Sequence, residues 1–470
     1  MKIKKNLKRN LGFLILLSIA FLFLFFPPLI RILFYKGFPA GTTNYGDIIV
    51  ASKLKFNNEF LETEKTKTIS PYYLFLNFSL KFINQNILMN FLPPVFGVLF
   101  ILLFYFLLKR IRVEKEVLFF ATLILILSSS FIYNFTTLNE NIFIMVFIAL
   151  GLLLFVSDNK IISVFGLLIL IIISVGNLIS SIVTYILLIM LITQRSLIFA
   201  YKSEKRKRAF FIITILFLMI SIINFYSSKN NFFNGYGQIL LYFSEVKMSD
   251  GFSIILIILS LIGLFNLGSE KKLLKNSFMA SIILLIIFGS NFIVYANVII
   301  CIAASYGFLW ITNRNWELKN LELWSIMLII CGIFFIAISV DLRIANQRPN
   351  LDDIEALNFL KDFDRGVVLS HQDYGFWLEQ ISKKDSFVNN LNEIYVEDQL
   401  KKLFQSTNLS FSLEMIDKNK IRYVFITPDM KSGLVWNKDD EGLLFIIKNN
   451  VRFKNVYNKN NYEIWEVLNE

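Results

Sequence analysis

Long apolar runs separated by short polar segments fill about the first three quarters of this 470-residue chain. Most runs approach the length that an α-helix needs to cross a bilayer, and they contain few charges. We place eleven membrane spans, near residues 11–35, 87–108, 117–134, 142–156, 161–175, 178–194, 209–226, 252–267, 277–290, 292–311 and 321–341. The two spans that flank Gly176 and Asn177 are also compatible with one broken helix. The pattern predicts a polytopic α-helical membrane domain over residues 1–341.

The basic start of the chain, followed by an apolar run, has the general form of a signal peptide. The run 11–35 is too long for one, however, and no small-residue cleavage site follows it. We therefore expect an uncleaved first span.

Residues 342–470 have a different pattern. Short β-branched or aromatic runs bounded by polar residues predict strands at 366–370, 422–428, 451–457 and 462–467. Apolar residues at helical spacing predict helices at 351–363, 397–404 and 409–419. The acidic residues that open the first of these suit a helix N-terminus. We expect a small α/β domain over 342–470, within the usual size of a domain.

Lysine and arginine gather in alternate loops between the predicted spans. One set carries 21 of them and begins with the N-terminus: residues 1–10, 109–116, 157–160, 195–208, 268–276 and 312–320. The opposite set carries seven: residues 36–70, 135–141, 176–177, 227–251 and 291. Since cytoplasmic loops are rich in Lys and Arg, we expect a multi-pass protein of the cell membrane with a cytoplasmic N-terminus. An odd number of spans then makes the C-terminal α/β domain extracytoplasmic.

The composition limits which partners and which kinds of site this protein can have. The net charge of +12 is explained by membrane topology, so we expect no nucleic-acid partner. The chain has one histidine and two cysteines, and Cys301 and Cys331 both fall in apolar runs. This composition excludes a Cys/His metal cluster and an external disulfide framework. Charges within the spans are few, which disfavours a transporter.

Three predicted external segments place an acidic residue close to a span: Asp47 in the first loop, Glu140 in the second and Glu245 in the loop 227–251. Carboxylates that converge at a membrane surface can hold a hard divalent cation such as Mn²⁺ or Mg²⁺. Such a cation can neutralise a pyrophosphate leaving group. Each acid is also compatible with a solvated loop, and Glu140 with the first turn of a helix.

The polar tail contains the stretch "VLSHQDYGF", which includes the only histidine. It resembles the W-W-D-Y-G segment of oligosaccharyltransferase catalytic subunits of archaea and bacteria, which are GT-C membrane glycosyltransferases. In that family a strand leads into a D-Y-G turn, an aromatic helix and a strand that ends in Asp or Asn. Here Val367–Ser370, Asp373–Gly375, Phe376–Trp377 and Val388–Asn390 follow the same order.

Other segments extend the resemblance over nearly the whole chain. The stretch "LLYFSEV" is similar to the family's fifth-loop S-E motif, with Glu245 on its Glu. The stretches "NYGDIIVASKL" and "FTTLNENIF" are similar to its first-loop and second external acidic segments. The departures are that His371 and Gln372 replace the two tryptophans, Asp47 stands where the family often has His, and Asn291 replaces an arginine.

The resemblance implies metal-dependent transfer of a glycan from a polyprenyl (dolichyl-type) phosphate or pyrophosphate carrier to a protein or glycan acceptor on the external face. It implies that Asp47, Glu140 and Glu245 bind the cation and act in catalysis. It also implies that the acceptor meets His371, Gln372, Asp373, Tyr374 and Gly375.

Three alternatives stay open. One is transfer of a single sugar from a polyprenyl monophosphate, and another is a non-catalytic scaffold derived from the family. The third is structural: the D-Y-G triplet is an ordinary turn in which Asp caps, Tyr packs and Gly takes a positive φ, and His371 is a plain surface residue.

Overall fold

The structure is a computed structural model, and it describes residues 2–53, 70–175, 178–198, 217, 219–221, 251–267, 272–389, 394–438 and 440–468. The chain divides into two compact units. The helical unit comprises residues 1–37 and 54–345, and the α/β unit comprises residues 38–53 and 346–470. The α/β unit therefore contains a segment from the first predicted loop as well as the C-terminal tail.

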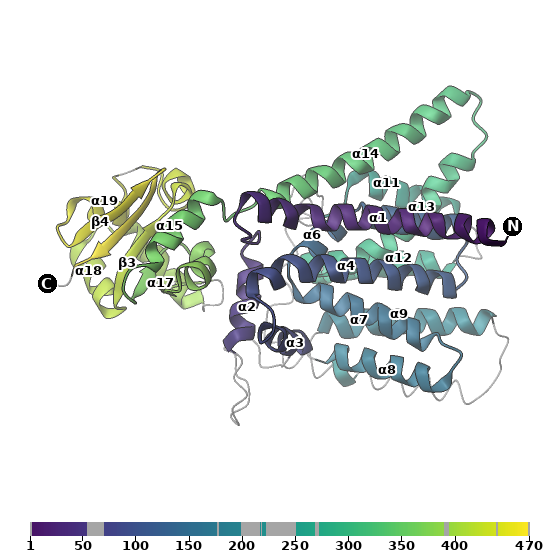
Figure 1. Cartoon of the computed structure of the whole chain (residues 1–470), viewed down its shortest axis with the longest axis horizontal. Helices are drawn as coiled ribbons and strands as arrows, with labels where there is room; N and C mark the ends of the chain where they lie inside the picture. Colours follow the sequence, from purple (N-terminus) through teal and green to yellow (C-terminus); the bar gives the residue numbers. More distant parts are fainter. Residues whose placement is uncertain are drawn as a thin grey trace. The chain divides into compact units, whose positions relative to one another are not determined.

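Among the described residues, the helical unit consists of α-helices and one short 3₁₀ helix (Figure 1). The described elements are α1 (Lys2–Phe34), α3 (Pro71–Leu80), α4 (Gln85–Arg110), α5 (Lys115–Ile126), α6 (Ser129–Thr136), α7 (Glu140–Phe155), α8 (Lys160–Ser174), α9 (Leu178–Ile198), α11 (Ile254–Asn266), α12 (Lys272–Phe288), η3 (Gly289–Phe292), α13 (Ile293–Asn313) and α14 (Lys319–Ala345). Ten of the eleven predicted spans coincide with these helices, whereas 209–226 lies mostly outside the described residues.

Helix length separates the spans into two groups. Among the described residues, Leu11–Phe34, α4, α13 and α14 are long and apolar enough to cross a membrane, and the pair α5 and α6 makes a fifth if it counts as one span. The helices α7, α8, α11 and α12 are apolar but shorter than the roughly 20 residues of a full crossing. The protein is a multi-pass membrane protein, and the number eleven remains a prediction.

The predicted continuous span 117–134 is wrong in one respect. It is broken between α5 and α6, whose axes differ by 58°. At the break the Ser128 hydroxyl donates to the Leu125 carbonyl at 2.8 Å and accepts from the Asn297 amide at 2.7 Å. Ser129 donates to the Gly251 carbonyl at 2.7 Å. Serine hydroxyls that bond the backbone compete with the helical ladder, and this is the physical reason for the bend.

Small residues bring two helix pairs into close contact. A Cβ atom on Gly307 of α13 would lie 1.9 Å from the Leu259 carbonyl oxygen of α11, and one on Gly263 would lie 2.1 Å from the Ala303 oxygen. The same holds for α7 and α8, where a Cβ on Gly166 would lie 2.7 Å from the Gly151 oxygen. Glycine at a helix crossing lets two backbones approach closely, as is typical within membranes.

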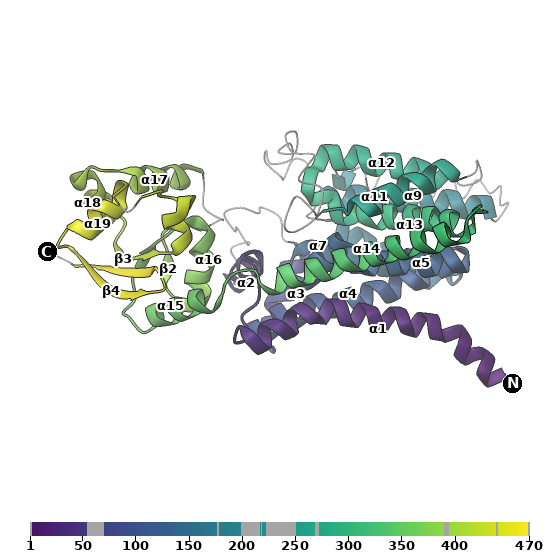
Figure 2. The ribbon, with the colours of Figure 1, turned by 90° about the horizontal axis from the view of Figure 1, so that it is seen from above.

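The α/β unit is built around a five-stranded mixed sheet (Figure 2). Its described elements are α2 (Thr43–Lys53), α15 (Leu351–Lys361), β1 (Val367–Leu369), η4 (Gln372–Tyr374), α16 (Gly375–Trp377), η5 (Leu378–Ser382), β2 (Asp385–Ser386), α17 (Ile394–Gln405), α18 (Leu409–Lys418), β3 (Ile421–Ile426), η6 (Met430–Leu434), α19 (Gly442–Asn449), β4 (Phe453–Lys459) and β5 (Tyr462–Val467). The strand order is β2-β1-β3-β5-β4. Strand β1 runs parallel to β2 and β3, and β5 runs antiparallel to β3 and β4.

The core of this unit is the central strand β3, which is buried at Ile421 and over 423–426. Figure 2 shows α15 on one side of the sheet and α17, α18 and α19 on the other. Helix α15 begins at a reciprocal capping box between Asn350 and Asp353, as its acidic start predicted. The predicted strands coincide with β1, β3, β4 and β5, whereas no helix was predicted at α19.

Candidate functional site

The D-Y-G segment lies at the carboxyl end of the parallel part of the sheet. Strand β1 leads into His371, β3 leads into Thr427 and Asp429, and β2 is followed by Asn389. Because β1 is parallel to both neighbours, these three connections emerge at one edge. In open α/β sheets this edge is the usual place for ligands.

The residues of the segment differ in exposure. The Asp373 side chain is 52% exposed and that of His371 is 18% exposed, while Tyr374 and Gly375 are buried. The His371 Nδ1 atom caps η4 by accepting from the Asp373 amide at 3.4 Å, and it lies 3.3 Å from Oδ2 of Asp373. Gln372 is partly exposed. The surface of the motif is therefore formed by Asp373 together with His371 and Gln372.

Gly375 has a different role from the one that the turn interpretation gave it. Its φ is −55° and its ψ is −44°, so it is right-handed helical and needs no positive φ. A Cβ atom here would lie 2.4 Å from the Val388 oxygen and 2.6 Å from the Asn389 Cβ. Glycine is required because the chain that follows β2 passes directly against it, and the expected positive φ is wrong.

Tyr374 anchors the segment to a partly buried polar cluster. Its hydroxyl accepts from Nη1 of Arg348 at 2.7 Å and donates to Oδ2 of Asp429 at 3.4 Å. Burial raises the pKa of Tyr374 to about 12, although a hydrogen bond with Thr427 and the charge of Arg348 act in the opposite direction. Tyr374 is therefore a neutral phenol at physiological pH and serves as a hydrogen-bonding anchor.

Helix α2, which carries Asp47, belongs to the same unit as the D-Y-G segment. The Trp377 indole donates to the Gly41 carbonyl at 3.3 Å, just before α2. A Cβ on Gly46 would lie 2.9 Å from the Phe376 ring, so α2 lies directly against α16. Asp47 itself is partly exposed. The structure thus brings together two predicted site segments that are more than 300 residues apart in the chain.

Glu140 belongs to the helical unit and is the first residue of α7. Its Oε1 accepts from the Ser70 hydroxyl at 2.6 Å, and Ser70 also caps α3 by accepting from the Tyr72 amide. The neighbouring Asn141 accepts from the Tyr295 hydroxyl at 3.3 Å. Glu140 therefore links the starts of two helices, which agrees with the favourable place for an acid at a helix N-terminus.

Mn²⁺ or Mg²⁺ would require carboxylates that converge. Asp47 and Glu140 lie in different units, and Glu245 lies outside the described residues. Within the described ranges, no group of three or more His, Cys, Asp or Glu side chains could hold a metal ion. The described residues therefore do not form a cation site by themselves, and we derive no catalytic step through a cation.

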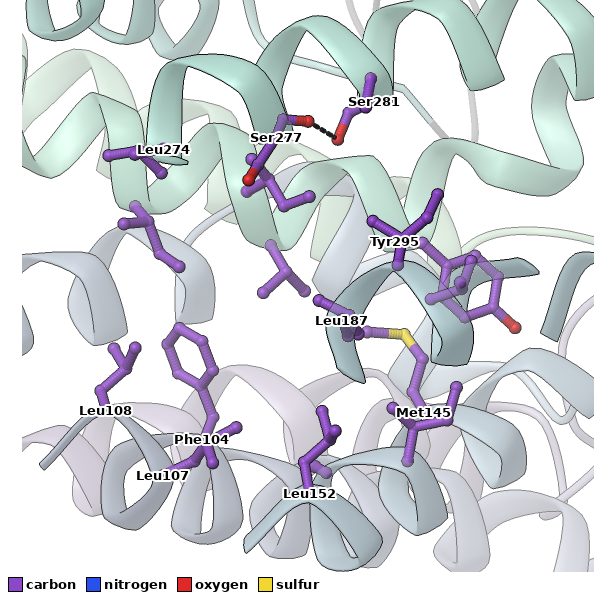
Figure 3. A pocket seen from close by; sticks show the side chains of 18 of the residues that line it. Phe104, Leu107, Leu108, Met145, Leu152, Leu187, Leu274, Ser277, Ser281 and Tyr295 are labelled. Carbon is purple, nitrogen blue, oxygen red and sulfur yellow. Dashed lines mark hydrogen bonds between the residues drawn. The ribbon is translucent and has the colours of Figure 1, made fainter. Parts of the chain in front are cut away.

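An apolar cavity lies inside the helical unit, with a volume of about 170 Å³ (Figure 3). Side chains from α4, α7, α9, α12 and α13 line it, among them Phe104, Met145, Leu187 and Tyr295. The Tyr295 hydroxyl bonds Asn141, the residue after Glu140. The cavity therefore extends to the neighbourhood of a predicted catalytic acid and is lined almost wholly by carbon.

Arg348 and Asp429 were not anticipated from the sequence. Asp429 follows the strand β3, and a polar residue at the end of a buried strand is the one signal that pointed to it. Arg348 lies between α14 and α15 and has no comparable signal, because Tyr374 and Asp429, which its side chain binds, are distant in the chain.

No protein-family model matches the sequence, and no curated protein matches it. Solved structures do resemble it. The Archaeoglobus fulgidus oligosaccharyltransferase in complex with Zn and sulfate has a TM-score of 0.63 and 12% identity, over 89% of this chain and 68% of that one. The archaeal oligosaccharyltransferase AglB from the same organism, in complex with an inhibitory peptide and a dolichol-phosphate, has a TM-score of 0.58 and 13% identity, over 90% and 70%.

ArnT from Cupriavidus metallidurans in the apo state has a TM-score of 0.54 and 9% identity, over 98% of both chains. At these identities the likeness is one of fold, and it extends over both units. The chain has an oligosaccharyltransferase-like GT-C fold with a strongly divergent sequence.

Proposed function

We propose that this protein is a glycosyltransferase that moves a glycan from a polyprenyl phosphate or pyrophosphate carrier to an acceptor on the external face of the membrane. The observation that carries the proposal is the contact of α2 with the D-Y-G segment. It joins the helix of a predicted catalytic acid to the predicted acceptor-binding segment. The fold shared with oligosaccharyltransferases and ArnT supports the same reading.

In this proposal Asp47, Glu140 and Glu245 bind a divalent cation and act in catalysis. The acceptor contacts Asp373, Gln372 and His371, which form the exposed surface of the motif. Tyr374 and Gly375 contribute by fixing that surface, since both are buried.

The apolar cavity supports a lipid-borne donor. Its carbon lining suits an isoprenoid chain, and Tyr295 connects it to the α7 start where Glu140 lies. An archaeal oligosaccharyltransferase of the same fold has been solved with a dolichol-phosphate. We infer that the carrier lipid enters the helical unit with its phosphate toward Glu140.

A single-sugar transfer from a polyprenyl monophosphate is the second candidate. His371 and Gln372 stand where oligosaccharyltransferases have two tryptophans, so the pocket for a peptide hydroxyl is altered. Their side chains can hydrogen-bond a hydroxyl-rich acceptor such as a glycan.

The test uses the full-length protein in liposomes with two donors, a pyrophosphate-linked oligosaccharide and a monophosphate-linked monosaccharide. Glu245→Ala, Asp47→Asn and Glu140→Gln are each expected to lower transfer at least about 100-fold, as loss of a charged catalytic group does. Asp158→Asn is the control, because this acid is 86% exposed and pairs with Arg110. Transfer that survives all three substitutions would exclude catalysis by these acids, whereas a wild-type protein that transfers from neither donor would favour a non-catalytic scaffold.

A further inference from the structure

Arg348 connects four parts of the α/β unit. Its carbonyl oxygen accepts from the Gly41 amide at 2.7 Å, in the segment that leads into α2. Its guanidinium donates to the Tyr374 hydroxyl at 2.7 Å. Nη1 and Nη2 lie 2.6 and 3.0 Å from the two carboxylate oxygens of Asp429, and Nε lies 3.8 Å from Oδ2 of Asp353.

The arrangement uses the planar fork of an arginine. Two nitrogens meet the two Asp429 oxygens side by side, and Nη1 also reaches the tyrosine. A lysine ammonium is a compact point charge and cannot make this bidentate contact. Arg348 is therefore specific in geometry as well as in charge.

The surrounding charges favour the protonated form of the Arg348 guanidinium. Burial lowers the pKa of Arg348, but the nearby Asp353, Tyr374, Tyr462 and Asp429 raise it more, so that its net pKa is raised. The guanidinium side chain is 28% exposed and that of Asp353 is 1% exposed. Asp353 is shielded from water, whereas the Asp429 side chain is 49% exposed, so solvent partly screens the Arg348–Asp429 pair. The bidentate geometry therefore constrains the surrounding groups more than the charge alone does.

We propose that Arg348 is a positioning residue that holds the D-Y-G segment and the Asp47 segment, residues 38–53, in one fixed arrangement. The backbone carbonyl of Arg348 binds the Asp47 segment at Gly41, and its side chain binds the D-Y-G segment at Tyr374. Its importance for catalysis rests on the proposed function, whereas the coupling of the two segments does not.

Hydrogen exchange of the full-length protein in lipid nanodiscs tests the coupling. Arg348→Ala keeps the backbone carbonyl that accepts from Gly41 but removes the charge-assisted side-chain bonds that hold this carbonyl in place. Exchange is therefore expected to speed up at least about tenfold both in residues 371–377 and in residues 38–53. The control is Arg422→Ala, which removes another arginine of this unit that pairs with two acids, Asp364 and Glu466. Its effect should stay near those partners.

Arg348→Lys keeps the charge without the planar fork, so it should also speed exchange in both segments. This variant supplies the test if Arg348→Ala fails to fold. Unchanged exchange in residues 38–53 in the lysine variant would overturn the proposal. In the transfer assay, the lysine variant should raise the acceptor KM more than it lowers kcat. A wild-type protein with no transfer, combined with coupled exchange, would refute the proposed function and leave the positioning role standing.

Discussion

Replacing Gly375 with alanine separates local conformational preference from tertiary packing. The residue has helical φ and ψ, so helix propensity alone predicts that alanine stabilises the unit by about 1 kcal/mol. The neighbouring chain predicts the opposite. A Cβ atom would lie 2.4 Å from the Val388 oxygen and 2.6 Å from the Asn389 Cβ.

The steric clash decides whether Gly375→Ala stabilises or destabilises the α/β unit. Ordinary contacts of a Cβ atom begin near 3.4 Å, so the chain after β2 must move by about an ångström. Forced overpacking of this kind costs about 1–3 kcal/mol. Because the nearest atom belongs to the backbone, the cost should lie in the upper part of this range, about 2–3 kcal/mol. After the propensity gain of about 1 kcal/mol, we expect Gly375→Ala to destabilise the α/β unit by about 1–2 kcal/mol.

Pulse proteolysis in urea measures this change in the full-length protein. With a urea dependence of about 2 kcal/mol per molar, the midpoint for cleavage of the α/β unit should fall by about 0.5–1 M. Gly12→Ala is a comparison for a helical glycine with space, since its Cβ would meet the Phe119 ring at 3.6 Å. A midpoint for Gly375→Ala at or above that of the wild type would refute the packing argument.

Three further outcomes are expected. Gly307→Ala should lower the unfolding temperature of the helical unit by several degrees, because its Cβ would lie 1.9 Å from a backbone oxygen of α11; an unchanged temperature would contradict the close crossing. Burial raises the pKa of Tyr374 from 10 to about 12, so the neutral phenol stabilises the folded state by up to about 3 kcal/mol, a contribution that is complete below pH 10 and is lost as the pH rises toward 12. Urea titrations should therefore show the wild type losing more stability than Tyr374→Phe over that range, and parallel losses would refute the pKa assignment. Val451 is 92% exposed, so Val451→Cys should react with an impermeant maleimide on intact cells if the α/β unit is external, and protection until lysis would invert the topology.

The elements of the fold were largely predictable because hydrophobic spacing records which face of each element is buried. Spans such as 87–108 and 292–311 coincide with α4 and α13, and the capped start of α15 was readable from its acids. The break before Ser129 was not predicted, because an apolar window averages over a few serines. The Ser128 hydroxyl at this break also accepts from Asn297, which lies far along the chain, so the local sequence does not record this contact.

The position of the candidate site was predictable from the sequence, whereas the roles of its individual residues were less so. The order of strand, D-Y-G, aromatic helix and strand located the segment. The place of Gly375 against Val388 depends on the chain that follows β2, which single-sequence patterns do not encode. The anchoring of Tyr374 by Arg348 and Asp429 likewise arises only when β1 and β3 align in parallel.

These contacts change how the D-Y-G triplet supports a function. Packing accounts for Gly375, and the cluster around Arg348 accounts for Tyr374, so neither residue by itself argues for chemistry. Asp373 is different: its side chain is 52% exposed at the carboxyl edge of the sheet, beside His371. The two buried residues that follow Asp373 therefore fix the position of this acid on the surface. The glycosyltransferase proposal therefore predicts that Asp373→Asn, which preserves shape and removes charge, weakens acceptor binding without lowering the stability of the α/β unit.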